Sequence, residues 1–245
     1  MRALRFLAAV ALGAAAHAPS APAAERVDLL LVLAADVSSS VKKPEFRLQR
    51  SGYASAFADP RVFSAIRATA TGRIGVAYVE WSGPWMQKLV IDWTLIGSAE
   101  AARRFSRRVM SAPRAFSKKS TSISAAIDFA AALLQRAPYR ASRRIIDISG
   151  DGDNNSGRPV AAARDDAVRK GITINGLVIL NMAAGPSSHS HPPGGLAKYY
   201  RRNVIGGAGA FVRAVEDYRS FDAALIRKLI REIAQRPAVE RLTSR

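Results

Sequence analysis

The sequence predicts an α/β protein with a doubly wound, mostly parallel central sheet of about six strands, one antiparallel edge strand, and helices on both faces. From Val27 onward, short apolar runs alternate with longer stretches of helical period, which is typical of such a sheet. The run VDLLLVLAA (27–35) is continuous enough to indicate a strand buried on both sides, and therefore central and parallel. The tripeptide Ser82-Gly83-Pro84 separates two further runs and predicts a hairpin, whose second strand is the antiparallel edge.

The remaining elements carry local signals of their own. Pro44 suits the first turn of a helix, because its fixed backbone angle is already helical. Gly171 is a helix stop before another apolar run. In chain order we expect a strand at 27–35, a helix at 44–58, strands at 73–81 and 87–94, helices at 99–110 and 122–136, a strand at 142–149, a helix at 159–170, strands at 172–180 and 210–215, and a helix at 221–234. The stretch MAAGPSSHSHPPGG (182–195) is expected to be a surface loop.

The start of the chain has the layout of a secretory signal peptide. Arg2 and Arg5 form a basic beginning, residues 6–16 form an apolar stretch short for a bilayer, and small residues suited to cleavage follow. We therefore expect a signal peptide at 1–24 and a single domain at 25–245, exported to the periplasm or secreted. A retained anchor and a buried N-terminal helix are the alternatives. No later segment is apolar over the roughly 18 residues that a membrane helix needs, so no retained transmembrane helix is expected.

The composition is strongly basic and free of cysteine. With no disulfides available, the hydrophobic core alone must stabilise the fold. Hydrophobic residues make up 49% of the chain, which is enough to form such a core. The formal net charge of +18 suggests an acidic partner or an anionic envelope surface such as membrane headgroups. Nucleic acid is not expected, because the chain is exported and no aromatic residues interleave with the arginines as a nucleic-acid platform requires. The plainer interpretation, which we favour, places the arginines on solvated helix faces.

Three oxygen-rich segments lie where an open α/β sheet binds its ligands, beyond the carboxyl ends of its strands. They are DVSSS (36–40), KKSTS (118–122) and SGDGDNNSG (149–157). Asp36, Ser38 and Ser40 are spaced two apart, so their side chains can face one way in an extended loop. Together with Thr121 and Asp151, they would offer hydroxyls and carboxylates to a hard cation such as magnesium, which prefers oxygen ligands and retains waters. Such a shell leaves room for an incoming carboxylate.

These segments resemble the von Willebrand factor type A domain and its metal-ion-dependent adhesion site. The family's pattern is Asp-x-Ser-x-Ser after strand one, a threonine in a second loop, and an aspartate after strand four, usually within Thr-Asp-Gly. DVSSS matches fully, Thr121 in STSISAAIDFA matches the threonine, and Asp151 in GDG matches the aspartate. VDLLLVLAADVSSSV, GRIGVAYVEWSG, RRIIDISGDGDNNSG, GITINGLVI and NVIGGAGAFV are similar, more closely, to an uncharacterised group of exported bacterial proteins of this type.

The resemblance implies metal-dependent protein binding, in which the partner supplies an acidic side chain to an open position on the cation. The implied ligands of a divalent cation are Asp36, Ser38, Ser40, Thr121 and Asp151. Mg²⁺ is expected, with Mn²⁺ and Ca²⁺ as alternatives. Two departures from the pattern matter: Gly150 stands where the family usually has threonine, and Asp153 adds a second carboxylate nearby. Either aspartate could be the ligand. The match to the family pattern favours Asp151, and Asp153 would then orient a ligand residue without binding the cation itself.

Several of these residues also have a plainer interpretation. The hydroxyls of Ser40 and Thr121 could cap the helices that follow them. Asp36 is different, because a carboxylate at the end of a doubly buried strand needs a cation or several donors. DGDNNSG begins like a helix–loop–helix calcium loop, but Ser156 replaces its glycine and Ala162 its bidentate glutamate, so we do not favour that interpretation.

The other polar residues do not indicate an enzyme. Asp147 inside IIDIS is predicted to be a hydrogen-bonded structural acid, and His189 and His191 form an H-x-H pair without a third ligand of matching type. The chain has no cysteine, no histidine near the Asp/Ser cluster, no G-x-S-x-G elbow and no phosphate-binding G-x-x-x-x-G-K-[ST] loop. We therefore expect a binding protein. A metal-dependent hydrolase that activates water at the same site and a structural envelope protein with a non-functional site are the alternatives.

Overall fold

The central sheet has six strands in the order β3-β2-β1-β4-β5-β6. A computed structural model describes residues 24–180 and 192–235 of the chain. The strands are β1 (Leu29–Asp36), β2 (Ile74–Trp81), β3 (Gln87–Ile96), β4 (Arg143–Gly150), β5 (Thr173–Ile179) and β6 (Val212–Val215). All neighbouring strands pair in parallel except β2 and β3, which are antiparallel. The predicted fold class, including the antiparallel edge strand, is therefore confirmed.

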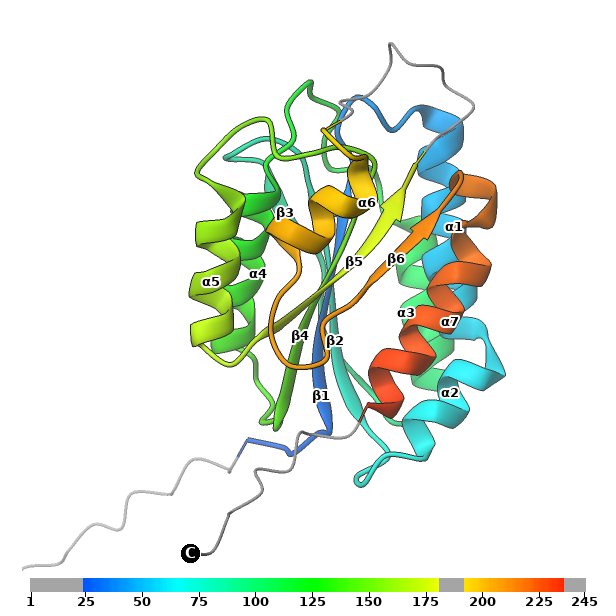
Figure 1. Cartoon of the computed structure of the whole chain (residues 1–245). Coiled ribbons are helices and arrows are strands. Elements are labelled where there is room, and N and C mark those ends of the chain that lie inside the picture. The colour runs from blue at the N-terminus through cyan, green and yellow to red at the C-terminus, as the bar shows by residue number, and fades with distance from the viewer. Residues whose placement is uncertain (1–23, 181–191, 236–245) are drawn as a thin grey trace, which may run out of the picture.

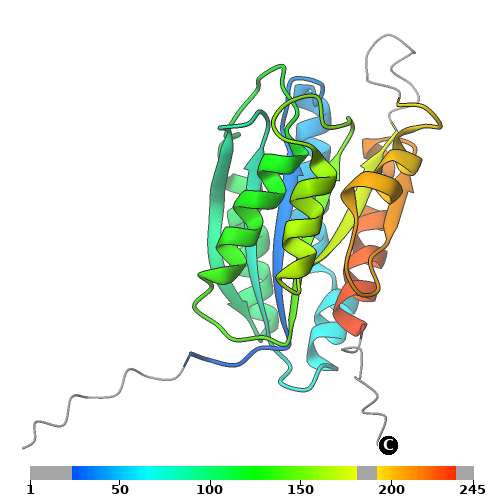
Figure 2. The same cartoon turned by 60° about the vertical axis from the view of Figure 1, so that its left-hand side comes forward.

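Helices cover both faces of this sheet (Figure 1). On one face lie α1 (Lys43–Ala58), α2 (Pro60–Arg67), α3 (Ala99–Ser111) and α7 (Phe221–Ala234). On the other face lie α4 (Ile123–Gln135), α5 (Val160–Arg169) and α6 (Leu196–Tyr199), which continues into a π-helical turn η2 (Tyr200–Val204). Figure 2 shows α4 and α5 side by side over that second face. A short 3₁₀ turn, η3 (Tyr218–Ser220), leads from β6 into α7.

The central strand β1 explains why the fold has two cores. All of its residues are buried, because neighbouring strands cover its edges and helices cover its faces. Successive side chains of a strand point to opposite faces, so Leu29, Leu31 and Leu33 join the core under α1 and α7. Leu30 and Val32 join the core under α4 and α5. The unbroken apolar run in the sequence is the direct consequence of this two-sided burial.

Two helical segments are additions to the elements expected from the sequence. The predicted helix at 44–58 is followed at once by α2, because Asp59 caps a new helix that opens with Pro60. The Asp59 carboxylate accepts a hydrogen bond from the backbone N–H of Arg61 at 2.7 Å, as an N-cap does. The second addition is α6 with η2, which follows the Gly/Pro-rich stretch.

Some expectations concern parts of the chain outside the described residues. The signal peptide at 1–24 lies there except for Ala24, as do His189 and His191 and most of the 182–195 loop. Across residues 24–180 and 192–235, no helix combines the length and the apolar character needed to cross a membrane.

Candidate metal centre

The predicted ligands come from loops at one edge of the sheet. Strands β1 and β4 are parallel neighbours, so Asp36 at the end of β1 lies beside the loop that begins with Asp151 after β4. Thr121 belongs to the loop before α4, directly before the helix cap Ser122, whose hydroxyl accepts from the N–H of Ala125. This loop is held to the hairpin, because the N–H of Ser122 donates to the carbonyl of Ser82 at 2.7 Å.

Four of the five predicted ligands form one hydrogen-bonded chain. The backbone N–H of Ser38 donates to Oδ1 of Asp36 at 2.7 Å. The hydroxyls of Ser38 and Ser40 lie 2.9 Å apart, and the hydroxyl of Ser40 donates to Oδ1 of Asp151 at 2.7 Å. The alternation of side chains in DVSSS therefore does what its spacing predicts: it turns Asp36, Ser38 and Ser40 towards one point.

Thr121, the fifth predicted ligand, lies next to Gly152 and is positioned by its backbone. Its N–H donates to the side-chain oxygen of Asn155 at 2.9 Å, and its carbonyl accepts from the N–H of Asn155 at 3.0 Å. Its side chain is buried, with its hydroxyl oxygen 3.9 Å from the place that a Cβ on Gly152 would occupy. These contacts join the loop before α4 to the loop after β4, and they bring Thr121 next to the residue that follows Asp151.

The electrostatics of this cluster are unfavourable without a cation. Asp36 is fully buried, and burial together with the negative charge of Asp151 raises the pKa of Asp36 to about 8. Its Oδ2 atom finds no hydrogen-bond partner among the residues that the structure describes. A buried carboxylate oxygen without a hydrogen-bond donor is costly in free energy. A divalent cation at Oδ2 would supply the missing partner.

The chemistry of the donors fits a hard cation. The cluster offers carboxylates and hydroxyls, which are the oxygen ligands that Mg²⁺ and Ca²⁺ prefer. Within the described parts of the chain, His, Cys, Asp and Glu nowhere gather in groups of three or more, so hydroxyls would have to supply part of the cation's ligand shell. The residues present therefore fit the group that the sequence resemblance implies.

A buried tyrosine accounts for Gly150, where the family usually has threonine. A Cβ on Gly150 would lie 2.8 Å from the hydroxyl oxygen of Tyr200 and 3.3 Å from Oδ2 of Asp36. Tyr200 is completely buried, and its hydroxyl donates to the carbonyl of Gly152 at 3.4 Å. The hydroxyl of Tyr200 thus takes the space that a side chain at position 150 would need.

Sequence reasoning missed Tyr200 and also Tyr218, whose hydroxyl donates to Oδ2 of Asp151 at 3.4 Å. Burial raises the pKa of both hydroxyls, and the negative charges of Asp36 and Asp151 raise it further. Both tyrosines therefore face the cluster as neutral donors. The one local signal was the pair Tyr199-Tyr200 directly after the Gly/Pro-rich stretch, since tyrosine has a large apolar ring that is often buried.

Asp153 lies on the side of the cluster that faces Tyr199 and Tyr200. It is half-buried, and its charge adds to the effect of burial in raising the pKa of both tyrosine hydroxyls. The adjacent Asn154 accepts a hydrogen bond from the N–H of Ser124 at 2.9 Å, which ties this loop to the start of α4. That Asp153 supports a metal ligand stays a prediction.

The strand order, the antiparallel edge and the loops at the carboxyl edge define the class of this protein: it has the fold of a von Willebrand factor type A domain. Within that class, the chain belongs to the family described as "Protein of unknown function (DUF1194)", whose sequence model matches residues 26–237. No curated protein matches the sequence.

Solved structures agree with the fold at low sequence identity. Proximal thread matrix protein 1 from the mussel byssus, with a zinc-occupied metal-ion-dependent adhesion motif, has a TM-score of 0.62 at 12% identity, over 86% of this chain and 49% of that one. A von Willebrand factor type A protein from Catenulispora acidiphila has a TM-score of 0.55 at 14% identity, over 85% and 42%. The pilus adhesin SpaC from Lactobacillus rhamnosus GG has a TM-score of 0.55 at 12% identity, over 86% and 31%. This chain therefore spans about half the length of these proteins or less.

Proposed function

We propose that this protein is an exported binding protein that holds a divalent cation and uses it to capture an acidic side chain of a protein partner. The cation ligands in this proposal are Asp36, Ser38, Ser40, Thr121 and Asp151. The observation that carries it is the buried Oδ2 of Asp36, which lacks a hydrogen-bond partner among the described residues. The hydroxyls of Ser38 and Ser40 and the carboxylate of Asp151 form a hydrogen-bonded chain that starts at the same aspartate. The zinc-occupied motif of the mussel protein, which shares the fold, supports it.

The cation proposed is Mg²⁺, with Mn²⁺ and Ca²⁺ as the alternatives to be tested beside it. Hydroxyls and carboxylates are hard donors, and they suit a small ion that keeps part of its water shell. When bound, such an ion supplies positive charge between Asp36 and Asp151 and an exchangeable position for a carboxylate from outside. The chain's own hydroxyls, from Ser38 and Ser40, would then orient towards the cation instead of towards each other.

An exposed tryptophan at the same edge supports a protein as the partner. Trp85, at the tip of the β2–β3 hairpin, is 94% exposed and lines a pocket of about 410 Å³. The other walls are Pro84 and Gln87 of the hairpin, Ser124, Ala125, Asp128 and Phe129 of α4, and Gly157 and Arg158 of the loop after β4. Large exposed aromatic residues beside a pocket are typical anchors of protein interfaces. We therefore propose that the partner carries an apolar side chain beside its acidic residue.

The location of the protein is part of the proposal. Cleavage after a signal peptide at 1–24 would release a domain of residues 25–245 into the periplasm or the medium, without a transmembrane anchor. The high positive charge, +18 in the whole chain, would favour acidic partners and anionic envelope surfaces at low ionic strength.

Thermal unfolding after chelation, followed by titration with Mg²⁺, Mn²⁺ and Ca²⁺, tests the cation site. A cation at a hundred times its Kd should add about 2.7 kcal/mol to the free energy of unfolding, and for a chain of this size each kcal/mol raises Tm by about 2–4 °C. Asp36→Asn should abolish that rise without lowering the Tm of the metal-free protein, because asparagine keeps the shape and the Oδ1 acceptor. Asp92→Asn, at an exposed carboxylate on β3, is the matched control and should respond like wild type. If no cation raises the wild-type Tm, the proposal is wrong.

Peptide binding tests the partner. Peptides with one aspartate flanked by apolar residues should bind in Mg²⁺ and not in chelator, and Trp85→Ala should weaken binding about tenfold. Because Trp85 is almost fully exposed, the variant should keep the wild-type Tm and cation affinity. Equal binding by Trp85→Ala would remove the pocket from the proposal while leaving the cation site in place.

A further inference from the structure

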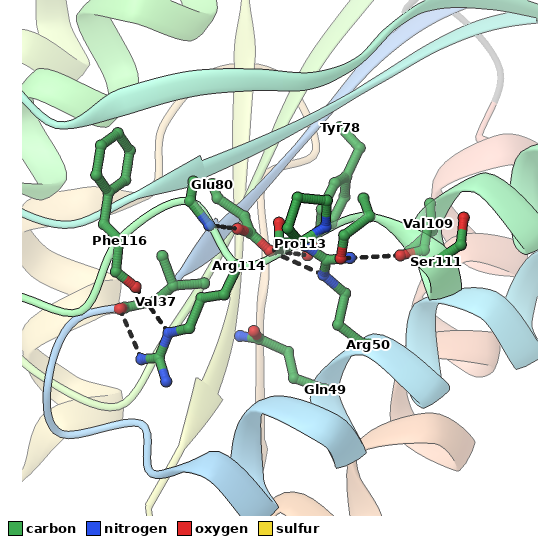
Figure 3. A network of polar contacts seen from close by, with 12 residues as sticks. Val37, Gln49, Arg50, Tyr78, Glu80, Val109, Ser111, Pro113, Arg114 and Phe116 are labelled. Carbon is green, nitrogen blue, oxygen red and sulfur yellow. Dashed lines mark hydrogen bonds and ion pairs between the residues drawn. The ribbon is translucent and has the colours of Figure 1, made fainter.

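A guanidinium lies behind the loop that carries three of the proposed ligands. Arg114, half-buried in the loop between α3 and α4, donates from one terminal nitrogen to the carbonyls of Val37 at 2.8 Å, Ser38 at 2.9 Å and Val41 at 2.8 Å. Its Nε donates to the carbonyl of Phe116 at 2.7 Å. Figure 3 shows the side chain reaching from its own loop to the carbonyl of Val37. Carbonyls on both sides of the ligand-bearing turn therefore converge on a single side chain.

This convergence matters because the loop has to curve. While the side chains of Asp36, Ser38 and Ser40 gather in one cluster, the carbonyls of the same loop turn towards Arg114. Buried carbonyls need donors, and one nitrogen of Arg114 meets three of them. The guanidinium is planar and always charged, so it holds such a set of acceptors rigidly. The shape of the ligand loop thus depends on a residue that does not touch the cluster's oxygens.

The backbone on both sides of Arg114 is held by a buried acid and its arginine partner. Oε2 of Glu80, on β2, accepts from the backbone N–H of Ala115 at 2.8 Å, and its Oε1 accepts from Nε of Arg50 at 2.8 Å. Arg50 also donates to the carbonyl of Ala112 at 2.7 Å, so the chain on both sides of Arg114 is fastened to α1 and β2 (Figure 3). Glu80 and Arg50 are almost completely buried. From the same helix, Gln49 donates to the carbonyl of Asp36 at 3.1 Å.

We propose that Arg114, fastened by Glu80 and Arg50, is a positioning residue of the cation site and sets its affinity by holding the loop of residues 37–41 in its curved form. The inference rests on the proposed function, since it concerns the same site. Removing side chains that orient metal ligands typically costs about 10–100-fold in metal affinity. We therefore expect Arg114→Ala to raise the Kd for Mg²⁺ by at least about tenfold.

The sign of the change separates positioning from simple charge. The Arg114 guanidinium is positive and acts electrostatically on Asp36, lowering its pKa against the larger effect of burial. If the charge alone mattered, its removal would tighten cation binding, because like charges repel. A positioning role predicts the opposite. Arg114→Lys keeps the charge but loses the planar guanidinium, so it should also weaken binding, although less than Arg114→Ala does.

Arg143 provides a matched control at the opposite end of the sheet. It is also half-buried, and it also donates to backbone carbonyls, those of Glu232 at 2.7 Å and Ile233 at 2.9 Å. Arg143→Ala should lower Tm about as much as Arg114→Ala while leaving the Kd for Mg²⁺ unchanged. Glu80→Gln tests whether Glu80 helps to hold the backbone around Arg114. The variant keeps an acceptor for the N–H of Ala115 and removes the charge that pairs with Arg50. It should weaken Mg²⁺ binding less than Arg114→Ala does.

The experiment combines calorimetric titration of Mg²⁺, well below each variant's Tm, with amide hydrogen exchange of the metal-free protein. The N–H groups of Ser39 and Val41, which donate to the carbonyls of Lys118 at 2.9 Å and Ser38 at 3.1 Å, should exchange faster in Arg114→Ala and Arg114→Lys than in Arg143→Ala. An unchanged or lower Kd in both Arg114 variants would overturn the inference. If wild type binds no cation, the proposed function fails instead, and unchanged exchange at Ser39 and Val41 would then show that Arg114 does not hold the loop. Should Arg114→Ala fail to fold, Arg114→Lys and Glu80→Gln decide the question.

Discussion

Two buried acidic clusters of this protein solve the same electrostatic problem in different ways. Beneath α7, the ammonium of Lys228 lies 2.5 Å from a carboxylate oxygen of Asp147 on β4 and 2.5 Å from one of Glu232, with all three side chains fully buried. At the carboxyl edge of the sheet, Asp36 and Asp151 are joined through serine hydroxyls. Oδ2 of Asp36, like Oδ2 of Asp147 and Oε2 of Glu232, has no hydrogen-bond partner among the described residues. The first cluster carries its own cation, whereas the second joins its carboxylates through hydroxyls.

The difference follows from the elements that build the clusters. Lys228 and Glu232 are one turn apart on α7, and Asp147 faces them from the middle of the sheet, so the charges are fixed by rigid secondary structure. The cluster at the edge is built from the loops that follow β1 and β4. The prediction that Asp147 is a structural acid is consistent with this pairing, although its partner is an ammonium on a distant helix. The first, closed cluster is thus held by rigid elements, and the second, open cluster is held by loops.

The largest expected effect concerns the closed cluster. Lys228→Met should lower the free energy of unfolding by about 3–5 kcal/mol, because it leaves Asp147 and Glu232 buried without their cation. Urea unfolding with a constant m-value measures this. The triple change Lys228→Met, Asp147→Asn and Glu232→Gln should recover most of the loss, since no buried charge is then left unpaired. A loss below about 1 kcal/mol for Lys228→Met would mean that the cluster does not depend on its internal cation.

A smaller effect is expected behind the open cluster, where Tyr200 fills the space beside Gly150. Gly150→Ala should cost about 1–3 kcal/mol of stability by overpacking, because the added Cβ would lie 2.8 Å from the tyrosine hydroxyl oxygen. Combining it with Tyr200→Phe should reduce that cost. Gly152→Ala is the control, since its nearest neighbours are 3.9 Å away, and it should change stability by less than about 0.5 kcal/mol. Equal costs at positions 150 and 152 would contradict the packing argument.

The third expected effect is a pH dependence of the closed cluster. Burial and the charge of Asp147 raise the pKa of Glu232 from 4.5 to about 7, with Lys228 and Asn175 acting in the opposite direction. The folded state then binds a proton that the unfolded state has lost, so this contribution is complete below pH 4.5 and is lost as pH rises to about 7. The slope is at most about 1.4 kcal/mol per pH unit.

The free energy of unfolding, measured from pH 4.5 to 8 for wild type and Glu232→Gln, isolates this group. The difference between the two curves should fall with rising pH and become flat above about pH 7. Asp222→Asn, at an exposed carboxylate on the same helix, should run parallel to wild type. A difference that does not change with pH would mean that Glu232 is charged throughout, and that Lys228 balances both acids together.

Much of the candidate site was predictable because it depends on local rules. Parallel strands end at one edge, so a carboxylate after β1 and one after β4 had to be neighbours once the strands were recognised. The alternation in DVSSS placed Asp36, Ser38 and Ser40 on one side without any knowledge of the rest of the fold. The hairpin at Ser82-Gly83-Pro84 predicted the antiparallel edge in the same way.

The residues that the sequence did not reveal reach the site from distant segments. Tyr200 comes from a π-helical turn and Tyr218 from a 3₁₀ turn, neither of which has a strong periodic signal. Arg114 was one arginine among many, and its role depends on three carbonyls about 75 residues earlier in the chain. The missed helix α2 has a simpler cause, because Asp59-Pro60 reads as an ending of one helix as readily as the cap of another.

The sequence by itself therefore determined the sheet, its edge strand, and the loops from which oxygens gather, because hydrophobic period and strand direction are set by neighbouring residues. Only the tertiary structure decided which side chains surround those oxygens: Tyr200 in place of a side chain at position 150, Tyr218 against Asp151, and Arg114 behind the ligand loop. Such contacts depend on the packed shape of every element between two distant segments, and local pattern does not encode that shape.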